Sequence, residues 1–428
     1  MIDLTSDVLV ERVTNINDQY FFGYYDMSPE SPDGTKVLVN KPRFIDHMPM
    51  VDDELEIGYI DLTAKSFNKI AETHAWNFQE GCRLQWLSDD FILFNDRGHT
   101  DGKSIKSYKY CVSSKKIVDE YSLPIYSVSI KRQIALSYNF FNNRYNYAHA
   151  SEEEKTDEKK DGIFLLDLKN GETKLVCSLD KLMKLANSYN TKNWVEHCVL
   201  SPEGDKFFFF HRWNLANGGF ATKFFVGDFK GNIECLLDNA FCSHSGWRGN
   251  NQISAWGRLP SKVNSVQNTS QIRESKFYKV ALRIYHRFVK SQAIRQKITN
   301  DSYIMFDLEK HSAKKISNMD IIQDGHCTWD NTGRFMLTDT YADNEKLRNL
   351  LILDYQTNQL YRLGRFYTYP FKNPLLEKEW TEPGIQCDLH PKWSFSQNHV
   401  YFDSVYEGKR QLYRVDVRKI MNDIIKNS

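Results

Sequence analysis

The chain has 428 residues, of which 26% are charged and 14% aromatic, a globular composition that excludes intrinsic disorder and collagen-like order. Its 56 lysines and arginines are balanced by 55 aspartates and glutamates, whereas a general nucleic-acid binder would carry a basic excess. We therefore expect no nucleic-acid partner. At about 100–200 residues per domain, the length allows two or three domains or one large repetitive domain.

The sequence also favours a reducing compartment. The first residues, MIDLTSDVLVERV, lack the basic and apolar regions of a signal peptide, and no stretch of about 18 apolar residues occurs. The eight cysteines are scattered without a C-x-x-C pair, which favours free thiols over disulfides or a cysteine-rich zinc site. We expect a cytoplasmic protein without a membrane span.

One pattern recurs along the chain: a Ser-Pro or aromatic start, a turn with Asp, Asn or Gly, and an alternating apolar strand. It is clearest at residues 28–40, 84–96, 199–213, 328–341 and 391–406. Most of these segments are followed by a second strand that ends near an aspartate. Period-2 patterning with Asp-Gly turns is typical of antiparallel hairpins.

These repeats predict an all-β fold, a seven-bladed β-propeller formed by residues 1–428 as a single domain. A four-strand unit repeated at irregular spacing is typical of that fold. Two weaker units, at 126–140 and 246–258, bring the number of blades to seven. A large β-sandwich or two β domains is the alternative.

Two insertions interrupt the repeats. Residues 141–161 are polar and highly charged, as expected of a solvated loop. Within residues 260–300, the segment 275–298 has seven lysines and arginines, no acid, and apolar residues at helical spacing. This predicted basic amphipathic helix could pack on the propeller, close over an acidic ligand, or lie on an anionic membrane or a lipid-linked saccharide.

Candidate functional residues are those that would line the central channel, where innermost strands of different blades meet. They are polar or aromatic side chains at strand starts. The candidates are Tyr24, Tyr25, His197, His211, Arg212, His244, Trp247, Arg248, His326, Tyr341, Gln386, Asp388 and His390.

Four of these histidines repeat at one position of the blade pattern. His244, His326 and His390 each shortly precede a tryptophan that begins a strand, and His197 shortly precedes Ser201. One such histidine is most simply a structural hydrogen-bonding group. Four at equivalent positions should converge on one face of the disc, which favours a functional site.

Part of this set has the composition of a metal site. Asp388 and His390 lie two residues apart and therefore share one face of a strand, and His326 comes from the neighbouring blade. Neutral imidazoles with a carboxylate suit a divalent metal. We predict a metal site of His326, Asp388 and His390, with Gln386 as a further candidate ligand.

The remaining candidates suit an acidic sugar. Arg212 and Arg248 have no obvious acidic partner in the sequence and could bind a carboxylate. Tyr24, Tyr25 and channel-facing tryptophans such as Trp247 offer flat apolar faces for sugar rings, although any one of them is more often a core residue.

At these residues the chain resembles the oligogalacturonate lyases, cytoplasmic seven-bladed propellers of the polysaccharide lyase type. The resemblance rests on the Ser-Pro-Asp-Gly strand pattern, the DGHCTW block, and the ending LHPKWS...YFDSVYEGKRQLYRVDV. It covers most of the chain in architecture and is most specific toward the C-terminal end. The FFGYYD and HRW segments show a shorter similarity to the ulvan-lyase-like propellers, which use His and Tyr as acid and base.

The resemblance implies a divalent metal, typically manganese, held by histidines of two late blades and a glutamine. The corresponding histidines here are His326 and His390, while Gln386 is displaced, lying two residues before Asp388 instead of three. It also implies His244 as the base and Arg212 as the assisting arginine. The chain departs from the family at residues 388–391, which read Asp-Leu-His-Pro where the family has His-Pro-His-Pro. Asp388 would lower the net charge of the site.

We hypothesise an enzyme, a carbon–oxygen lyase that cleaves a uronate-containing poly- or oligosaccharide by β-elimination. The C5 proton of a uronic acid is weakly acidic, so a metal or an arginine must neutralise the adjacent carboxylate. His244 would be the base, with Arg212 and Arg248 on the carboxylate.

The alternative is a non-catalytic propeller that binds a glycan or a partner in surface-polysaccharide metabolism. A propeller peptidase is disfavoured because no G-x-S-x-G motif occurs. Glycoside hydrolysis remains possible, although no pair of carboxylates stands out by spacing.

Overall fold

The computed structural model describes residues 1–97, 104–142, 157–215, 219–238, 241–259, 301–316, 321, 323–368 and 386–426. The charged loop expected at 141–161 lies mostly outside these residues, and the basic segment 275–298 lies wholly outside them. The roles considered for that segment therefore stay predictions. Among the described residues, no helix is long and apolar enough to cross a membrane.

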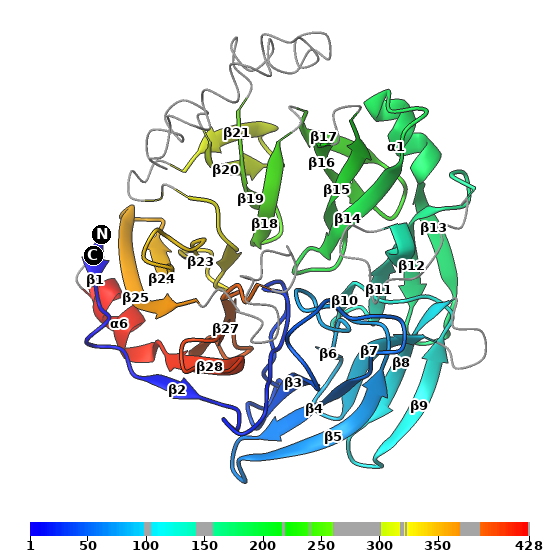
Figure 1. The fold of residues 1–428 in the computed structure, drawn as a ribbon. Coiled ribbons are helices and arrows are strands. Elements are labelled where there is room, and N and C mark those ends of the chain that lie inside the picture. The colour runs from blue at the N-terminus through cyan, green and yellow to red at the C-terminus, as the bar shows by residue number, and fades with distance from the viewer. Residues whose placement is uncertain are drawn as a thin grey trace.

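Seven sheets follow one another around a ring in chain order, which confirms the predicted seven-bladed β-propeller (Figure 1). Blades one to three are formed by β3 (Lys36–Pro42), β4 (Leu55–Asp61) and β5 (Ser66–Thr73); β6 (Gln85–Trp86), β7 (Phe91–Arg97), β8 (Ile105–Cys111) and β9 (Lys116–Tyr121); and β10 (Ser127–Ser129), β11 (Ile134–Ser137), β12 (Gly162–Asp167) and β13 (Thr173–Ser178).

Blades four to seven continue the ring. Their strands are β14 (Asn193–Leu200), β15 (Lys206–Asn214), β16 (Phe220–Asp228) and β17 (Ile233–Leu237); β18 (Cys242–Arg248), β19 (Gln252–Gly257), β20 (Ser302–Asp307) and β21 (Ser312–Lys315); β22 (Thr328–Trp329), β23 (Phe335–Asp339), β24 (Leu347–Asp354) and β25 (Gln359–Tyr367); and β26 (Lys392–Trp393), β27 (His399–Ser404) and β28 (Gln411–Asp416). The helices in the described ranges are η1 (Phe140–Asn142), α1 (Leu179–Ala186) and α6 (Arg418–Lys426).

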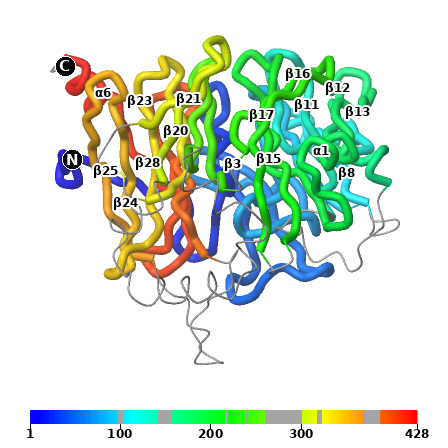
Figure 2. Tube along the Cα trace, turned by 90° about the horizontal axis from the view of Figure 1, so that it is seen from above, coloured from blue at the N-terminus to red at the C-terminus, as the bar shows by residue number. Residues whose placement is uncertain are grey.

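The N-terminal strands close the ring. β2 (Val10–Arg12) pairs antiparallel with β28 and completes blade seven. β1 (Ile2–Asp3) pairs parallel with β25 and adds a fifth strand to blade six. Both views place the two termini at the same side of the ring (Figures 1 and 2).

Each blade buries both faces against its neighbours, and β15 shows how the sequence achieves this. Phe207 and Phe209 point to the core shared with blade three, while Phe208 and Phe210 point to the core shared with blade five. Successive side chains of a strand face opposite sides, so a run of four phenylalanines fills both interfaces. The run of phenylalanines is continuous because neither face of this sheet is exposed to solvent.

Residues 22–26, here called the crossing segment, run through the central channel. At one end the Asp403 carboxylate accepts a hydrogen bond of 2.8 Å from the Phe22 backbone N–H. At the other end Arg83 forms a bidentate pair with Asp26, at 2.7 and 3.1 Å. The segment is thus fixed to blade seven and to the start of blade two.

Gly23 in the crossing segment should not tolerate a side chain. Its φ is +121°, and a Cβ there would lie 3.0 Å from backbone atoms of Glu80. We expect Gly23→Ala to lower the free energy of unfolding by about 1–3 kcal/mol, measured by urea denaturation. Gly249 also has a positive φ but open space around its Cβ position, so Gly249→Ala is the matched control. Equal losses would show that the Glu80 contact costs nothing.

Candidate active site

Four histidines from four consecutive blades meet around the two tyrosines of the crossing segment. The four, called here the channel histidines, are His197, His244, His326 and His390. The ring centroid of His326 lies 4.2 Å from that of His244 and 4.3 Å from that of His390. Tyr24 stacks on His197 at 5.1 Å, and Tyr25 lies 5.1 Å from His326. Both tyrosines are buried, so their ring faces support the histidines.

Local backbone irregularities turn these histidines into the channel. The pairing of β14 with β15 shifts between Glu196 and Val199, and that of β18 with β19 shifts between Ser243 and Ser245. His197 and His244 lie within these bulges, which re-aim side chains. His197 and His390 also have positive φ values of 53° and 43°, which non-glycine residues adopt rarely and often at functional sites.

Each channel histidine is anchored through Nδ1. The partners are Asp339 Oδ1 for His326 (2.8 Å), Asp324 Oδ1 for His244 (2.9 Å), the Gly23 carbonyl for His390 (3.1 Å) and the Tyr126 hydroxyl for His197 (2.9 Å). Carboxylates and carbonyls only accept, so these Nδ1 atoms carry the proton. Tyr126 donates to Glu80 and therefore accepts from His197. In its neutral form, each of the four rings therefore has its lone pair at Nε2.

His326, Asp388 and His390 form a set of donors that fits a divalent cation. One potential ligand atom from each lies within 4.8 Å of the others. Asp388 Oδ2 is 4.0 Å from His390 Nε2, which is buried and has no hydrogen-bond partner among the described residues. A buried lone pair that faces a carboxylate is what a metal ligand requires. We call these three residues the ligand trio.

The two histidines of the trio have different electrostatic surroundings. Burial, followed by the nearby His326, lowers the pKa of His390 well below its ordinary value, so the ring is neutral at pH 7. Burial also acts to lower the pKa of His326, but the charge and hydrogen bond of Asp339 outweigh it and raise that pKa above the ordinary 6.5. His326 is therefore the trio histidine at which protons compete with a metal.

His244 lies beside the trio without belonging to it. Its Nδ1 is held by Asp324, which also accepts a hydrogen bond from the Ser243 hydroxyl. The ring of Tyr341 lies 6.2 Å from both His244 and His326, and Tyr341 is 38% exposed. An imidazole with a carboxylate at Nδ1 and a free lone pair at Nε2 is suited to accept a proton.

The two arginines predicted to bind a carboxylate are engaged elsewhere. Arg212 pairs with the buried carboxylate of Glu196, one residue from His197. Arg248 donates to the Gly333 carbonyl at 2.6 Å and lies over the Trp329 ring. The structure does not bring either guanidinium to the ligand trio, and their predicted roles stay predictions.

A third arginine, which sequence reasoning missed, contacts the trio. Arg348 in β24 lies 2.6 Å from Asp388 Oδ1 through Nη1 and is only 3% exposed. Its signal in the sequence is the alternation with Leu350 and Ile352, both fully buried, which makes position 348 inward-facing. The anchors of His244 and His326, Asp324 and Asp339, were missed as well.

Three other predicted residues have partners outside the trio. Gln386 is exposed, and its backbone carbonyl accepts a hydrogen bond from Arg410, so its role as a ligand stays a prediction. His211 is buried inside blade four, 2.9 Å from Asn193 Oδ1, and burial lowers its pKa to about 3. Trp247 packs against blade four.

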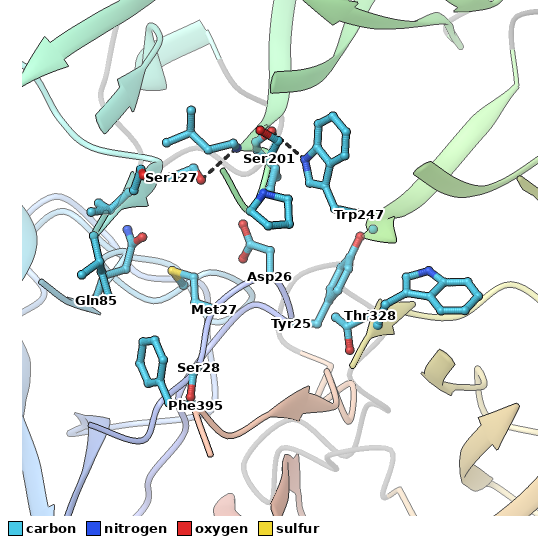
Figure 3. Close-up of a pocket in the computed structure, with 18 of the residues that line it drawn as sticks. Tyr25, Asp26, Met27, Ser28, Gln85, Ser127, Ser201, Trp247, Thr328 and Phe395 are labelled. Carbon is cyan, nitrogen blue, oxygen red and sulfur yellow. Dashed lines mark hydrogen bonds between the residues drawn. The ribbon is translucent and has the colours of Figure 1, made fainter. Parts of the chain in front are cut away.

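A cavity of about 640 Å³ lies further along the channel. Tyr25 lines it, together with residues 245–247 and 328–329, which follow His244 and His326 in the chain, whereas none of the channel histidines does (Figure 3). Two of its polar groups serve the fold, because Ser127 accepts a hydrogen bond from Leu200 N–H and Trp247 donates to the Val199 carbonyl. Tyr25 thus separates this cavity from the ligand trio.

Comparison with solved structures finds the same fold in two oligogalacturonate lyases. One, solved in complex with manganese, is 14% identical, with a TM-score of 0.63 over 97% of this chain and 95% of that one. The other, from Vibrio parahaemolyticus, is 12% identical, with a TM-score of 0.61 over 98% and 96%. No protein-family model and no curated protein matches the chain. The likeness shows the fold, a seven-bladed β-propeller, and the activity must be argued from the site.

Metal affinity should rise with pH. His326 can ligate only after it loses its proton, and Asp339 raises the pKa of His326 above its ordinary value, so protons compete with the metal at any pH below that raised pKa. We expect the Mn²⁺ affinity, measured by calorimetry, to rise about tenfold per pH unit while His326 is mostly protonated. Asp339→Asn should move this dependence to lower pH. An affinity that is constant between about pH 5.5 and 8 would contradict this assignment.

Proposed function

We propose that this protein is a metal-dependent lyase that cleaves a uronate-containing oligosaccharide by β-elimination. The observation that carries the proposal is the placement of His244 against the ligand trio, with its ring 4.2 Å from that of His326. Manganese is the metal proposed, because an oligogalacturonate lyase of the same fold was solved in complex with manganese. The substrate class is an acidic oligosaccharide, and the proposed location is cytoplasmic.

The reaction needs a base and a means of neutralising the substrate carboxylate. In β-elimination the C5–H bond breaks, a C4–C5 double bond forms, and the C4–O bond breaks as the leaving oxygen takes up a proton. A divalent cation held by the ligand trio would supply the positive charge that stabilises the enolate-like transition state. His244 Nε2 accepts the C5 proton, and Asp324 stabilises the imidazolium that results.

The ligand trio should account for the bound metal. We expect protein purified without chelator to contain about one divalent ion per chain, measured by mass spectrometry of the elements, as a trio of this kind holds a single ion. The double variant His326→Ala with His390→Ala should lose it. His311 is 71% exposed at its side chain and remote from the trio, so His311→Ala is the control. Retention of metal in the double variant, with the fold checked by circular dichroism, would sink the proposed site.

His244→Ala should reduce formation of the unsaturated product by about 10²–10⁴-fold, the usual contribution of a general base. The assay is the ultraviolet absorbance of unsaturated uronate released from oligogalacturonate and other uronate oligosaccharides. Metal content should not change, because His244 is not in the trio. Undiminished product from His244→Ala would show that another group is the base. Metal-loaded wild-type protein that binds these oligosaccharides without product would favour the non-catalytic binder.

A further inference from the structure

Arg348 is a buried cation at a position where its strand otherwise faces the core. It shares its face of β24 with Leu350 and Ile352, which are fully buried. Burying an unpaired guanidinium is strongly unfavourable, because the charge loses its hydration. A buried arginine at this position therefore needs an acidic partner, and that partner is Asp388.

This pairing leaves much of the guanidinium unused. Nη1 contacts Asp388 Oδ1 at 2.6 Å and the Thr340 carbonyl at 3.5 Å, and Nε has no hydrogen-bond partner in the described part of the chain. By contrast, Arg83, also buried, binds Asp26 with two nitrogens and the Tyr126 carbonyl as well. A guanidinium has five N–H donors, so Arg348 retains capacity for a second carboxylate.

The geometry of Asp388 lets a metal and Arg348 be bound together. Oδ1 faces Arg348, while Oδ2 faces His390 Nε2 at 4.0 Å. One oxygen can therefore ligate a cation while the other stays on the arginine. Arg348 would then remain beside the cation and need not be displaced by it.

Charge balance gives this pair a consequence for substrate binding. The resemblance to the oligogalacturonate lyases aligns Asp388 with a position that is histidine in that family, and a carboxylate there would weaken attraction to an acidic sugar. The positive charge of Arg348 cancels the negative charge of Asp388, so the pair has no net charge, like a neutral imidazole. A metal ion held by the ligand trio would therefore keep its full attraction for a substrate carboxylate.

We propose that Arg348 binds the carboxylate of the uronate substrate while it holds Asp388 as a monodentate ligand. The inference rests on the proposed function and adds the residue that recognises the acid. The guanidinium lies 5.7 Å from the ring of Tyr341, which is partly exposed, so the substrate approaches beside that ring.

The test compares D-galacturonate with its methyl ester, which has the same ring and no charge. Binding to manganese-loaded protein is measured by calorimetry. Wild type should prefer the free acid, and Arg348→Gln should weaken acid binding by about 10- to 100-fold, the usual worth of a charge-assisted hydrogen bond. Binding of the ester should change little. The variant leaves His326, Asp388 and His390 unchanged, so bound manganese should be retained.

Two further variants make the result decisive. Arg365, on the neighbouring strand of the same blade, pairs with Asp343 and Glu345 at the surface, so Arg365→Gln is the matched control and should behave as wild type. Arg348→Lys should recover part of the preference because it restores the charge. A preference for the acid that is unchanged in folded Arg348→Gln would overturn the inference and leave the proposed lyase standing. Wild type without metal or without product from uronates would overturn the proposed function itself.

Discussion

Hydrogen bonds at Nδ1 hold the channel histidines, and the chemistry available to the site depends on them. An unanchored imidazole can present either nitrogen, whereas a held Nδ1–H leaves only the lone pair of Nε2 to face the channel. The hold is firmest at His326, where Asp339 Oδ1 also accepts from the backbone N–H of the same residue at 2.7 Å. Backbone and ring are fixed by one carboxylate, so His326 has little freedom to move away from the trio.

The crossing segment links this constraint to closure of the ring. The carbonyl of Gly23 accepts from both His390 Nδ1 and Lys392 Nζ, and Lys392 also pairs with Asp403. These contacts join residues near the N-terminus to blade seven, the blade that β2 completes. The contacts that tie the crossing segment to the last sheet therefore also orient His390, one member of the ligand trio.

The sequence was sufficient for the fold because the evidence for a blade is local. Each blade is a run of consecutive hairpins, so its strand starts recur in the chain, and the histidines at those starts necessarily come together. Pairing between side chains is not local in this sense. The sequence shows no obvious acidic partner for Arg212, yet Glu196 on the adjacent strand pairs with it. Strand register and side-chain direction decide such contacts, and neither is visible in spacing alone.

The same reasoning applies to Asp388. Its negative charge is unfavourable for binding an acidic sugar when the sequence is considered alone, but in the structure Arg348 balances that charge. Taken alone, a carboxylate in place of a neutral donor makes the site less attractive to an acid. Arg348, 40 positions earlier in the chain, reaches Asp388 from blade six, and neither residue is exposed enough for water to screen the pair fully. The pair crosses the boundary between blades six and seven, beside His326 and His390. One contact thus sets the charge of the site and ties together the two blades that supply its ligands.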